Sequence, residues 1–209
     1  MKNILIATSN PGKLDEIRLF LSGLPVKLLG LSDVGLTADA PETGVTFKEN
    51  AIEKARYYFR ESGLPSLADD GGLEIDALDG APGVHSHRWA KFRPGDDGDD
   101  AIIRHTLAAL SGVPAGKRGA QLRVVVALVL PDGSEHFGEG TVRGIIAEKP
   151  AAVRTKGYPY RSLLYLPEIR KFYNHELLTP RETEKYNHRK RALRTVMPAI
   201  RNWLTHAVK

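Results

Sequence analysis

The sequence predicts an α/β protein built on a mixed sheet. Short β-forming segments alternate with amphipathic helical segments along the chain, an order typical of α/β proteins. A long hairpin at 121–146 interrupts this alternation, so we expect antiparallel strands beside parallel ones. Of the 209 residues, 42% are hydrophobic and 26% charged, a globular composition. No repeat or low-complexity tract divides the chain, and we therefore treat 1–209 as a single folding unit.

The first third of the chain alternates strand and helix signals. Pro11 favours the first turn of a helix, and Gly23 is a helix stop. Thr46 and Glu49 form a capping box, in which each residue satisfies a free backbone N–H of the other. These signals predict strands at 3–8 and 26–31, a helix from Pro11 to Gly23, a loop at 32–45, and a helix with a buried face formed by Phe47, Ala51, Ala55 and Tyr58.

The remaining elements follow from apolar periodicity and turn residues. Pro198 lies inside the last helical pattern, so we expect a kink or a break there. We predict a short strand at 64–68 that ends at 69–72, a strand or strand-like turn at 73–78, a loop at 92–99, a helix at 100–110, strands at 121–130 and 135–146, and a helix at 190–206.

Charge is distributed unevenly. Residues 1–153 carry 17 basic and 21 acidic side chains, whereas residues 154–209 carry 13 basic and 4 acidic ones. A basic C-terminal quarter favours an anionic partner: nucleic acid, a membrane surface or a small phosphorylated ligand.

The absence of cysteine excludes disulfides, a thiolate nucleophile and cysteine zinc sites. No apolar stretch approaches the ~20 residues of a membrane span, and no signal-peptide core is present, which predicts a cytoplasmic protein without membrane contact.

The first candidate site is the segment Thr8-Ser9-Asn10-Pro11-Gly12-Lys13. It lies where a strand gives way to a helix N-terminus, and the free N–H groups and the helix dipole there favour an anion. Gly12 lets a ligand approach the backbone, and Lys13 adds a positive charge. The spacing differs from that of a P-loop. The alternative is a capped helix start with a solvated lysine.

The second candidate site is the pair Asp69 and Asp70, which follows an apolar segment and precedes two glycines. Ligands of α/β folds bind at strand ends, and Mg²⁺ takes one or two carboxylates with water and substrate phosphate. If the strand continued through the pair, the two side chains would point in opposite directions, and one of them would reach the metal. The alternative is an ordinary Asp-Gly turn.

A third cluster combines Glu42 with Asn50 and Lys54. Asn50 and Lys54 are spaced i,i+4 and share one face of the predicted helix, while Glu42 lies in the loop before it. Near one phosphate chain, Glu42 would be a Mg²⁺ ligand and Lys54 a charge clamp. We interpret Glu49 as a capping residue only.

The basic run 187–191 begins the last predicted helix. Arg189 offers a fork of donors to phosphate or carbonyl groups, and His188 can donate to a base edge. A nucleic-acid patch is the competing interpretation, but the run is short and lacks interleaved aromatic residues. A solvated helix face is the alternative for Lys190.

The segment 80–89 holds His85 and His87. Two histidines two residues apart can bind a metal, but no third ligand stands at a useful spacing. We therefore expect a structured loop in which Arg88 and Trp89 pack or dock a partner subunit.

Four segments, taken in order, resemble the inosine triphosphate pyrophosphatase family: TSNPGK (8–13), ETGVTFKENAIEKA (42–55), LADDGGLEIDALDGAPGVHS (67–86) and NHRKRAL (187–193). The resemblance implies an elongated mixed α/β fold of two lobes around a nucleotide cleft, and a homodimer. It implies hydrolysis of ITP, dITP and XTP to the monophosphate and pyrophosphate, with Mg²⁺ as cofactor.

The resemblance also assigns roles. Asp70 is implied as general base and metal ligand, Glu42 as the second metal carboxylate, and Lys13 and Lys54 as catalytic cations. Such hydrolysis needs charge neutralisation and an aligned water more than a protein nucleophile. The positions implied for substrate binding are Thr8, Ser9, Asn10, Pro11, Gly12, Lys13, Gly71, Tyr158, Pro159, Tyr160, Arg161, Thr183, His188 and Arg189.

The chain departs from the family pattern at four places. Gly71 replaces a serine, Tyr158-Pro159-Tyr160-Arg161 replaces F-G-Y-D, Thr183 replaces a lysine with Lys185 close by, and Pro41-Glu42 replaces an acidic pair. Arg161 reverses a charge, so base recognition is expected to be altered while phosphate and metal handling are kept. The alternatives are a relative that acts on other modified nucleotides and a catalytically silent nucleotide- or nucleic-acid-binding protein.

Overall fold

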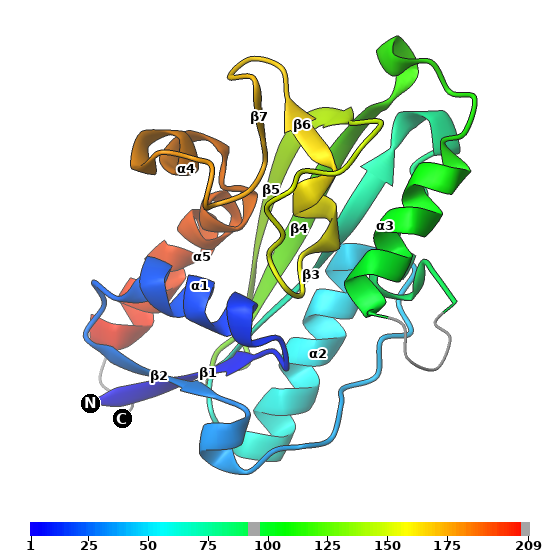
Figure 1. The fold of residues 1–209 in the computed structure, drawn as a ribbon. Helices are drawn as coiled ribbons and strands as arrows, with labels where there is room; N and C mark the ends of the chain where they lie inside the picture. The colour runs from blue at the N-terminus through cyan, green and yellow to red at the C-terminus, as the bar shows by residue number, and fades with distance from the viewer. Residues whose placement is uncertain (92–96, 206–209) are drawn as a thin grey trace. The chain divides into compact units, whose positions relative to one another are not determined.

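The computed structural model describes residues 1–91 and 97–205 and contains one mixed sheet (Figure 1). Its strand order is β2-β1-β3-β4-β5-β6-β7. β1 pairs in parallel with β2 and β3, whereas β5, β6 and β7 pair antiparallel. The strands are β1 Lys2–Ala7, β2 Val26–Gly30, β3 Ser66–Ile75, β4 Gly119–Val129, β5 Glu135–Ile146, β6 Leu164–Leu166 and β7 Lys171–Phe172.

The helices begin at local capping signals. Asn10 caps α1 by accepting from the Lys13 N–H, and Thr46 with Glu49 forms the predicted capping box of α2. Asp97 caps α3 by accepting from two backbone N–H groups. The helices are α1 Pro11–Leu21, α2 Phe47–Ser62, α3 Gly98–Ala109, α4 Pro180–Tyr186 and α5 His188–Thr205. Within the described residues, none of them is long and apolar enough to cross a lipid bilayer.

The chain divides into two compact units that interleave in sequence. The first holds residues 1–70, 124–140 and the chain from 188 onward, and the second holds 71–123 and 141–187. Each unit has its own cluster of buried apolar side chains. The expectation of a single domain over 1–209, and that of a cleft between lobes, stay predictions.

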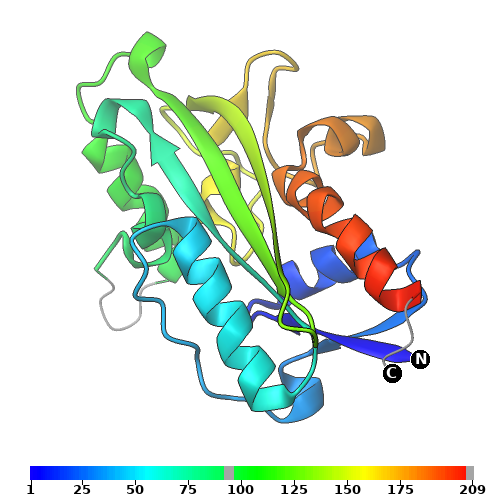
Figure 2. The same ribbon diagram turned by 180° about the vertical axis from the view of Figure 1, so that it is seen from behind.

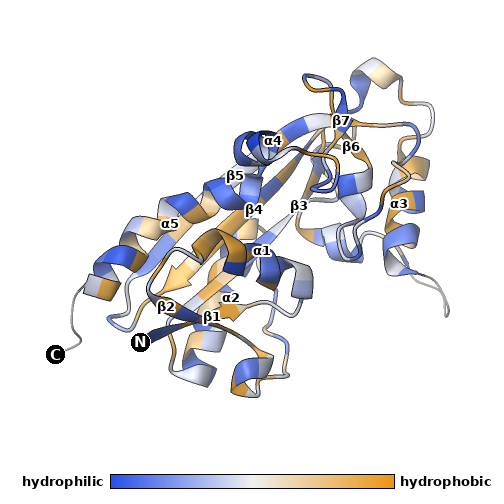
Figure 3. Cartoon of the chain, turned by 60° about the vertical axis from the view of Figure 1, so that its left-hand side comes forward, coloured by the Kyte–Doolittle hydropathy of each residue, from blue (hydrophilic) through white to orange (hydrophobic). Residues whose placement is uncertain are grey.

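In the first unit, side-chain alternation sorts the core onto two faces of the strands. Ile4 and Ile6 of β1 pack in one cluster with Ile17 of α1 and Leu193 of α5. Helix α2 packs against β1 from the other face (Figure 2). Hydrophobic and hydrophilic residues alternate along α5 (Figure 3), as expected of a helix with one buried stripe.

In the second unit, the core gathers residues from β3 and α3 with the segment that follows β5. Arg118 is buried there and donates to the backbone carbonyls of Leu110 and Ile146. Because these acceptors end α3 and β5, Arg118 ties two elements to the start of β4.

The predicted end of the strand at 69–72 is wrong, because β3 runs without interruption from Ser66 to Ile75. Gly72 fits this path because a Cβ there would lie 2.0 Å from the Ser86 hydroxyl, which accepts from the Leu73 N–H. The two carboxylates are accommodated inside the strand because distant residues supply their partners.

Three further differences concern helices and loops. Helix α5 continues through Pro198 without a break; Pro198 and Arg194 are exposed, so the carbonyl that loses its donor can bind water. Of the loop predicted at 92–99, residues 92–96 lie outside the described residues, and Gly98 already belongs to α3. Residue 206, the predicted end of the last helix, also lies outside the described residues. Helix α4 was not predicted, although Thr179 and Glu182 form a capping box there.

Candidate active site

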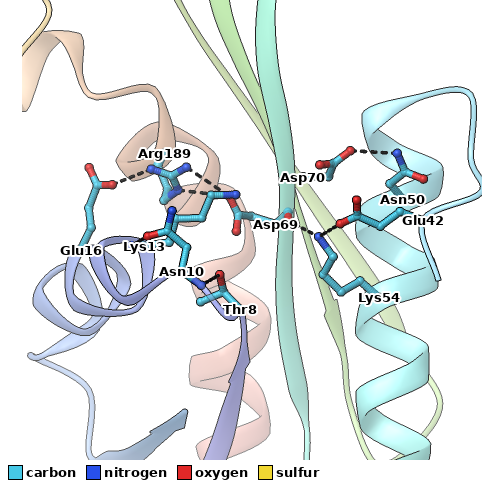
Figure 4. Close-up of polar contacts among 10 residues, drawn as sticks. All are labelled: Thr8, Asn10, Lys13, Glu16, Glu42, Asn50, Lys54, Asp69, Asp70 and Arg189. Atoms are coloured by element: carbon cyan, nitrogen blue, oxygen red, sulfur yellow. Dashed lines mark hydrogen bonds and ion pairs between the residues drawn. The ribbon is translucent and has the colours of Figure 1, made fainter. Parts of the chain in front are cut away.

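The site is centred on Asp69 and Asp70 of β3, which point to opposite faces of the sheet (Figure 4). Ala68 pairs with Ala7, the last residue of β1. The two carboxylates therefore lie just beyond the carboxyl end of β1, where the chain turns into α1. Strand alternation gives each carboxylate different neighbours, as the sequence predicted for a continuous strand.

The turn from β1 to α1 is built by its own polar side chains. The Thr8 hydroxyl accepts from the Asn10 N–H at 3.2 Å, and the Asn10 carbonyl oxygen Oδ1 accepts from the Lys13 N–H at 3.2 Å. The Lys13 side chain is buried, and its ammonium lies 3.1 Å from Asp69 Oδ2. The alternative of a solvated lysine is therefore wrong, because an ion pair holds Lys13 inside the protein.

Asp69 is the centre of a buried charge network that joins α1, β3 and α5. Arg189 donates to Asp69 Oδ2 from Nε at 3.3 Å and from Nη2 at 3.1 Å, and to Glu16 from Nη1 at 2.5 Å. Burial acts to raise the pKa of Asp69, but Lys13 and Arg189 outweigh it and hold the pKa far below its ordinary value. Asp69 is thus an anion at neutral pH. Burial lowers the pKa of Lys13, an effect that Asp69 opposes.

Asp70 faces α2, where Asn50 and Lys54 meet it from one helix face. The Asn50 amide donates to Asp70 Oδ2 at 3.0 Å. The Lys54 ammonium forms an ion pair with Glu42 and donates to the Asp69 carbonyl oxygen at 3.3 Å. Lys54 is therefore not solvated, while Glu49 accepts from the Thr46 N–H as the predicted cap.

The environment of Asp70 suits a proton acceptor. Burial raises the pKa of Asp70, and Lys54 and Asn50 offset only part of that rise. Burial also acts against the charged form of Lys54, but Glu42 and Asp69 outweigh it and raise the pKa of Lys54. Two adjacent carboxylates thus have opposite pKa shifts because they face opposite sides of the sheet.

Among the described residues, no group of three or more His, Cys, Asp and Glu side chains is placed to hold a metal alone. This includes His85 and His87, which lie in the 3₁₀ helix Gly83–Arg88 of the second unit. Glu42 and Asp70 supply hard oxygen ligands beside the half-buried Lys54. Such a pair fits Mg²⁺, which is commonly held by one or two carboxylates together with substrate phosphate and water.

The predicted base-recognition segment belongs to the second unit. The Arg161 guanidinium is buried and stacks on the Tyr158 ring, 3.9 Å from its centroid, with the Tyr173 ring at 5.7 Å. The Tyr160 hydroxyl donates to the Ser86 carbonyl oxygen at 2.7 Å. The roles of Gly71 in β3, of Thr183 in α4 and of Tyr158, Pro159, Tyr160 and Arg161 toward a base stay predictions.

His188 begins α5 in the first unit and is buried. A Cβ at Gly140 would lie 2.0 Å from the His188 carbonyl oxygen, so this glycine lets α5 approach β5 closely. Thr8, Asn10, Lys13, Glu42, Lys54, Asp70 and Arg189, all predicted from the sequence, meet in one group of polar contacts (Figure 4).

Glu16 was not among the candidate residues, and Asn50 was placed in the cluster with Glu42 and Lys54 but not given a role (Figure 4). Asp69 was considered with Asp70 but not given a role. Helical spacing of Glu16 from Lys13 places both on one face of α1, and this is the signal that could have found it. No local pattern links Glu16 or Asp69 to Arg189, which lies more than 100 positions away from both in the sequence.

Buried cations around paired carboxylates, next to a helix N-terminus, are the features of an α/β protein that binds a phosphorylated ligand. More particularly, the chain belongs to the Ham1 family, whose model matches residues 4–199. It is 40% identical over 206 residues to a Streptomyces coelicolor protein named dITP/XTP pyrophosphatase, with 98% of this chain and 100% of the relative covered.

Solved structures give the same result for the fold. A HAM1 protein from Coxiella burnetii matches with a TM-score of 0.81 and 33% identity, covering 97% of this chain and 100% of that one. The Staphylococcus aureus Ham1 protein matches with a TM-score of 0.80 and 30% identity, covering 96% and 99%. The predicted family and the α/β fold with a mixed sheet and flanking helices are confirmed.

Proposed function

We propose that this chain hydrolyses nucleoside triphosphates of non-standard purines, namely dITP, XTP and ITP, to the monophosphate and pyrophosphate. The observation that carries the proposal is that buried Lys13 of α1 and Asp70 of β3 lie in one group of polar contacts with half-buried Lys54 of α2 (Figure 4). The name dITP/XTP pyrophosphatase of the 40% identical relative supports the substrate class.

The proposed reaction is attack of water on the α-phosphorus with release of pyrophosphate. Asp70 accepts the proton of the attacking water, a role that its raised pKa favours. Segment 8–13 and the N-terminus of α1 hold the triphosphate. Lys13 and Lys54 stabilise the negative charge that develops on the phosphate oxygens.

We further propose that Mg²⁺ is the cofactor and that Glu42 and Asp70 hold it. Bound there, the ion would neutralise phosphate charge. Glu42 forms an ion pair with Lys54 in this structure, and this contact orients the Glu42 carboxylate. The chain's own residues bind the triphosphate, orient the water and accept its proton.

For the base, we propose contacts from His188 and from the segment Tyr158 to Arg161. In this structure the Arg189 guanidinium makes ion pairs with Asp69 and Glu16, so its proposed contact with the base requires one of these pairs to loosen. The stacked guanidinium of Arg161 places a positive charge on one face of the Tyr158 ring. A cation here favours bases that carry a partial or full negative charge.

The family resemblance also supports a homodimer without nucleic-acid or membrane partners, acting in the cytoplasm on the nucleotide pool. Light scattering should then give twice the monomer mass of 23.0 kDa.

The function is tested by measuring pyrophosphate release from a panel of ITP, dITP, XTP and the common triphosphates. We expect the non-standard purines to be cleaved with the highest kcat/KM. Equal rates on all triphosphates would overturn the substrate class. Tight binding without turnover would instead identify a silent nucleotide-binding protein.

A further inference from the structure

We propose that Asn50 is a positioning residue that fixes the Asp70 carboxylate and the loop bearing Glu42 in one arrangement. The proposal rests on the proposed function for its catalytic consequence, but the contacts on which it is built are independent of the reaction. Asn50 itself is 1% exposed.

The Asn50 side chain uses both ends of its amide. Its oxygen Oδ1 accepts from the Gly44 N–H at 2.8 Å, and its nitrogen Nδ2 donates to Asp70 Oδ2 at 3.0 Å. A backbone N–H can only donate, so the end of the amide that faces Gly44 must be the oxygen. This determines the orientation of the amide and places its donor on Asp70.

The first of these bonds controls the loop before α2. A Cβ at Gly44 would lie 2.5 Å from the Glu49 Cβ and 2.8 Å from Asn50 Oδ1. The loop therefore packs directly on the first turn of α2 and is bonded to Asn50 two residues after Glu42. Since Lys54 holds Glu42 from the same helix face, α2 fixes the position of that carboxylate at two points.

The second bond determines which oxygen of Asp70 is presented for reaction. Oδ2 is bound to Asn50, so Oδ1 is the oxygen that would take a water or a metal. One buried amide thus couples both carboxylates of the proposed metal pair, and its loss should disorder both. Removing such supporting partners typically costs 10–100-fold in metal affinity or activity.

Two variants separate this role from simple anchoring of the loop. Asn50→Leu removes both bonds, whereas Asn50→Asp keeps an acceptor for Gly44 but replaces the donor toward Asp70 with a carboxylate oxygen. We expect both to lower kcat at saturating nucleotide and Mg²⁺ by about 10–100-fold, with a much smaller change in the KM of the nucleotide. An Asn50→Asp variant with wild-type kcat would reduce Asn50 to a loop anchor and overturn the proposal.

The matched control is Glu53→Ala. Glu53 lies on the same helix and accepts from the Thr43 N–H at 3.2 Å and from the Thr43 hydroxyl. It anchors the same loop without contacting Asp70. We expect kcat of this variant to stay within about threefold of the wild type, an effect in the range of a minor anchor. A loss equal to that of Asn50→Leu would overturn the proposal.

A second readout needs no activity. The free energy of unfolding in urea is measured for the wild type, Asn50→Leu, Asp70→Ala and the double variant. If Asn50 holds Asp70, the cost of Asn50→Leu is smaller in the Asp70→Ala background, because contacting residues are not additive. Additive effects would overturn the proposal. Non-additive effects of the two substitutions, in a wild-type protein that cleaves no triphosphate, would refute the proposed function and leave the contact between Asn50 and Asp70 standing.

Discussion

At the scale of single residues, Asp69 and Asp70 are chemically identical neighbours with opposite roles. Asp69 is held as an anion by Lys13 and Arg189, whereas burial raises the pKa of Asp70. The difference arises because consecutive residues of a strand face opposite sides of the sheet. In the proposed function, one carboxylate is therefore structural and the other accepts the proton of the attacking water.

Asp70→Asn should greatly slow turnover and yet preserve the fold. We expect kcat to fall by about 10²–10⁴-fold, the contribution of a general base. Because the folded pKa of Asp70 lies above its ordinary value of 3.8, its favourable contribution to stability exists below that value and is lost as pH rises through the folded pKa. At pH 7 the variant should be at least as stable as the wild type in urea unfolding.

The control for that variant is Asp39→Asn, which removes an exposed carboxylate outside the site. It should keep kcat and stability near the wild-type values. Retained turnover in Asp70→Asn, or a marked loss of stability at pH 7, would contradict the assignment.

Asp69→Asn should have the opposite effect on stability. It leaves Lys13 and Arg189 buried with too little negative charge, and breaking such pairs costs about 3–5 kcal/mol. The depressed folded pKa of Asp69 means that its contribution is present above 3.8 and is lost as pH falls through the folded pKa. Urea unfolding between pH 7 and pH 3 should show a steeper acid loss in the wild type than in the variant.

At the scale of elements, the starts of α1 and α2 were predictable and the course of β3 was not. The starts of α1 and α2 are set by residues within a few positions, Asn10 for α1 and Thr46 with Glu49 for α2. In β3 the Asp-Asp-Gly-Gly segment has the composition of a turn. It remains extended because partners from α1, α2 and α5 satisfy the carboxylates, and no local pattern contains that information.

Pro198 gives a prediction for α5. It is exposed inside a continuous helix, where proline costs about 3 kcal/mol relative to alanine. Pro198→Ala should therefore raise the free energy of unfolding by up to about 3 kcal/mol without changing kcat. Urea unfolding measures it, with Ala199→Gly as a destabilising counterpart. An unchanged or lower stability would show that the helix is already adapted to the proline.

At the scale of the whole molecule, the charge asymmetry of the sequence has a partial structural explanation. Arg189, one of the C-terminal cations, is neutralised by Glu16 and Asp69 from the first third of the chain. The basic run at 188–191 belongs to the first unit, which also holds the carboxylates of the site, Glu16, Glu42, Asp69 and Asp70. An internal network, rather than a surface for nucleic acid, accounts for the most buried of these charges.

Ligand binding should stabilise the whole protein only when metal and nucleotide are both present. Chelation with EDTA should stop hydrolysis, and added Mg²⁺ should restore it. With the wild type, ITP in a non-hydrolysable form and Mg²⁺ together should raise the free energy of unfolding by about 2.7 kcal/mol at 100 times Kd. Thermal unfolding with each ligand alone is the comparison. An equal shift with ITP alone would remove Mg²⁺ from the proposal.

The sequence by itself determined the starts of α1 and α2, the hairpin, the order of the motifs and through them the family, because these depend on neighbouring residues. Only the tertiary structure decided that Arg189 pairs with Asp69 and Glu16, that Lys13 is buried, and that Asn50 joins Gly44 to Asp70. The period of a strand shows that two neighbours face opposite ways. Which helix covers each face depends on contacts between residues up to 173 positions apart, and that decides which aspartate is held as an anion and which is available to act as a base.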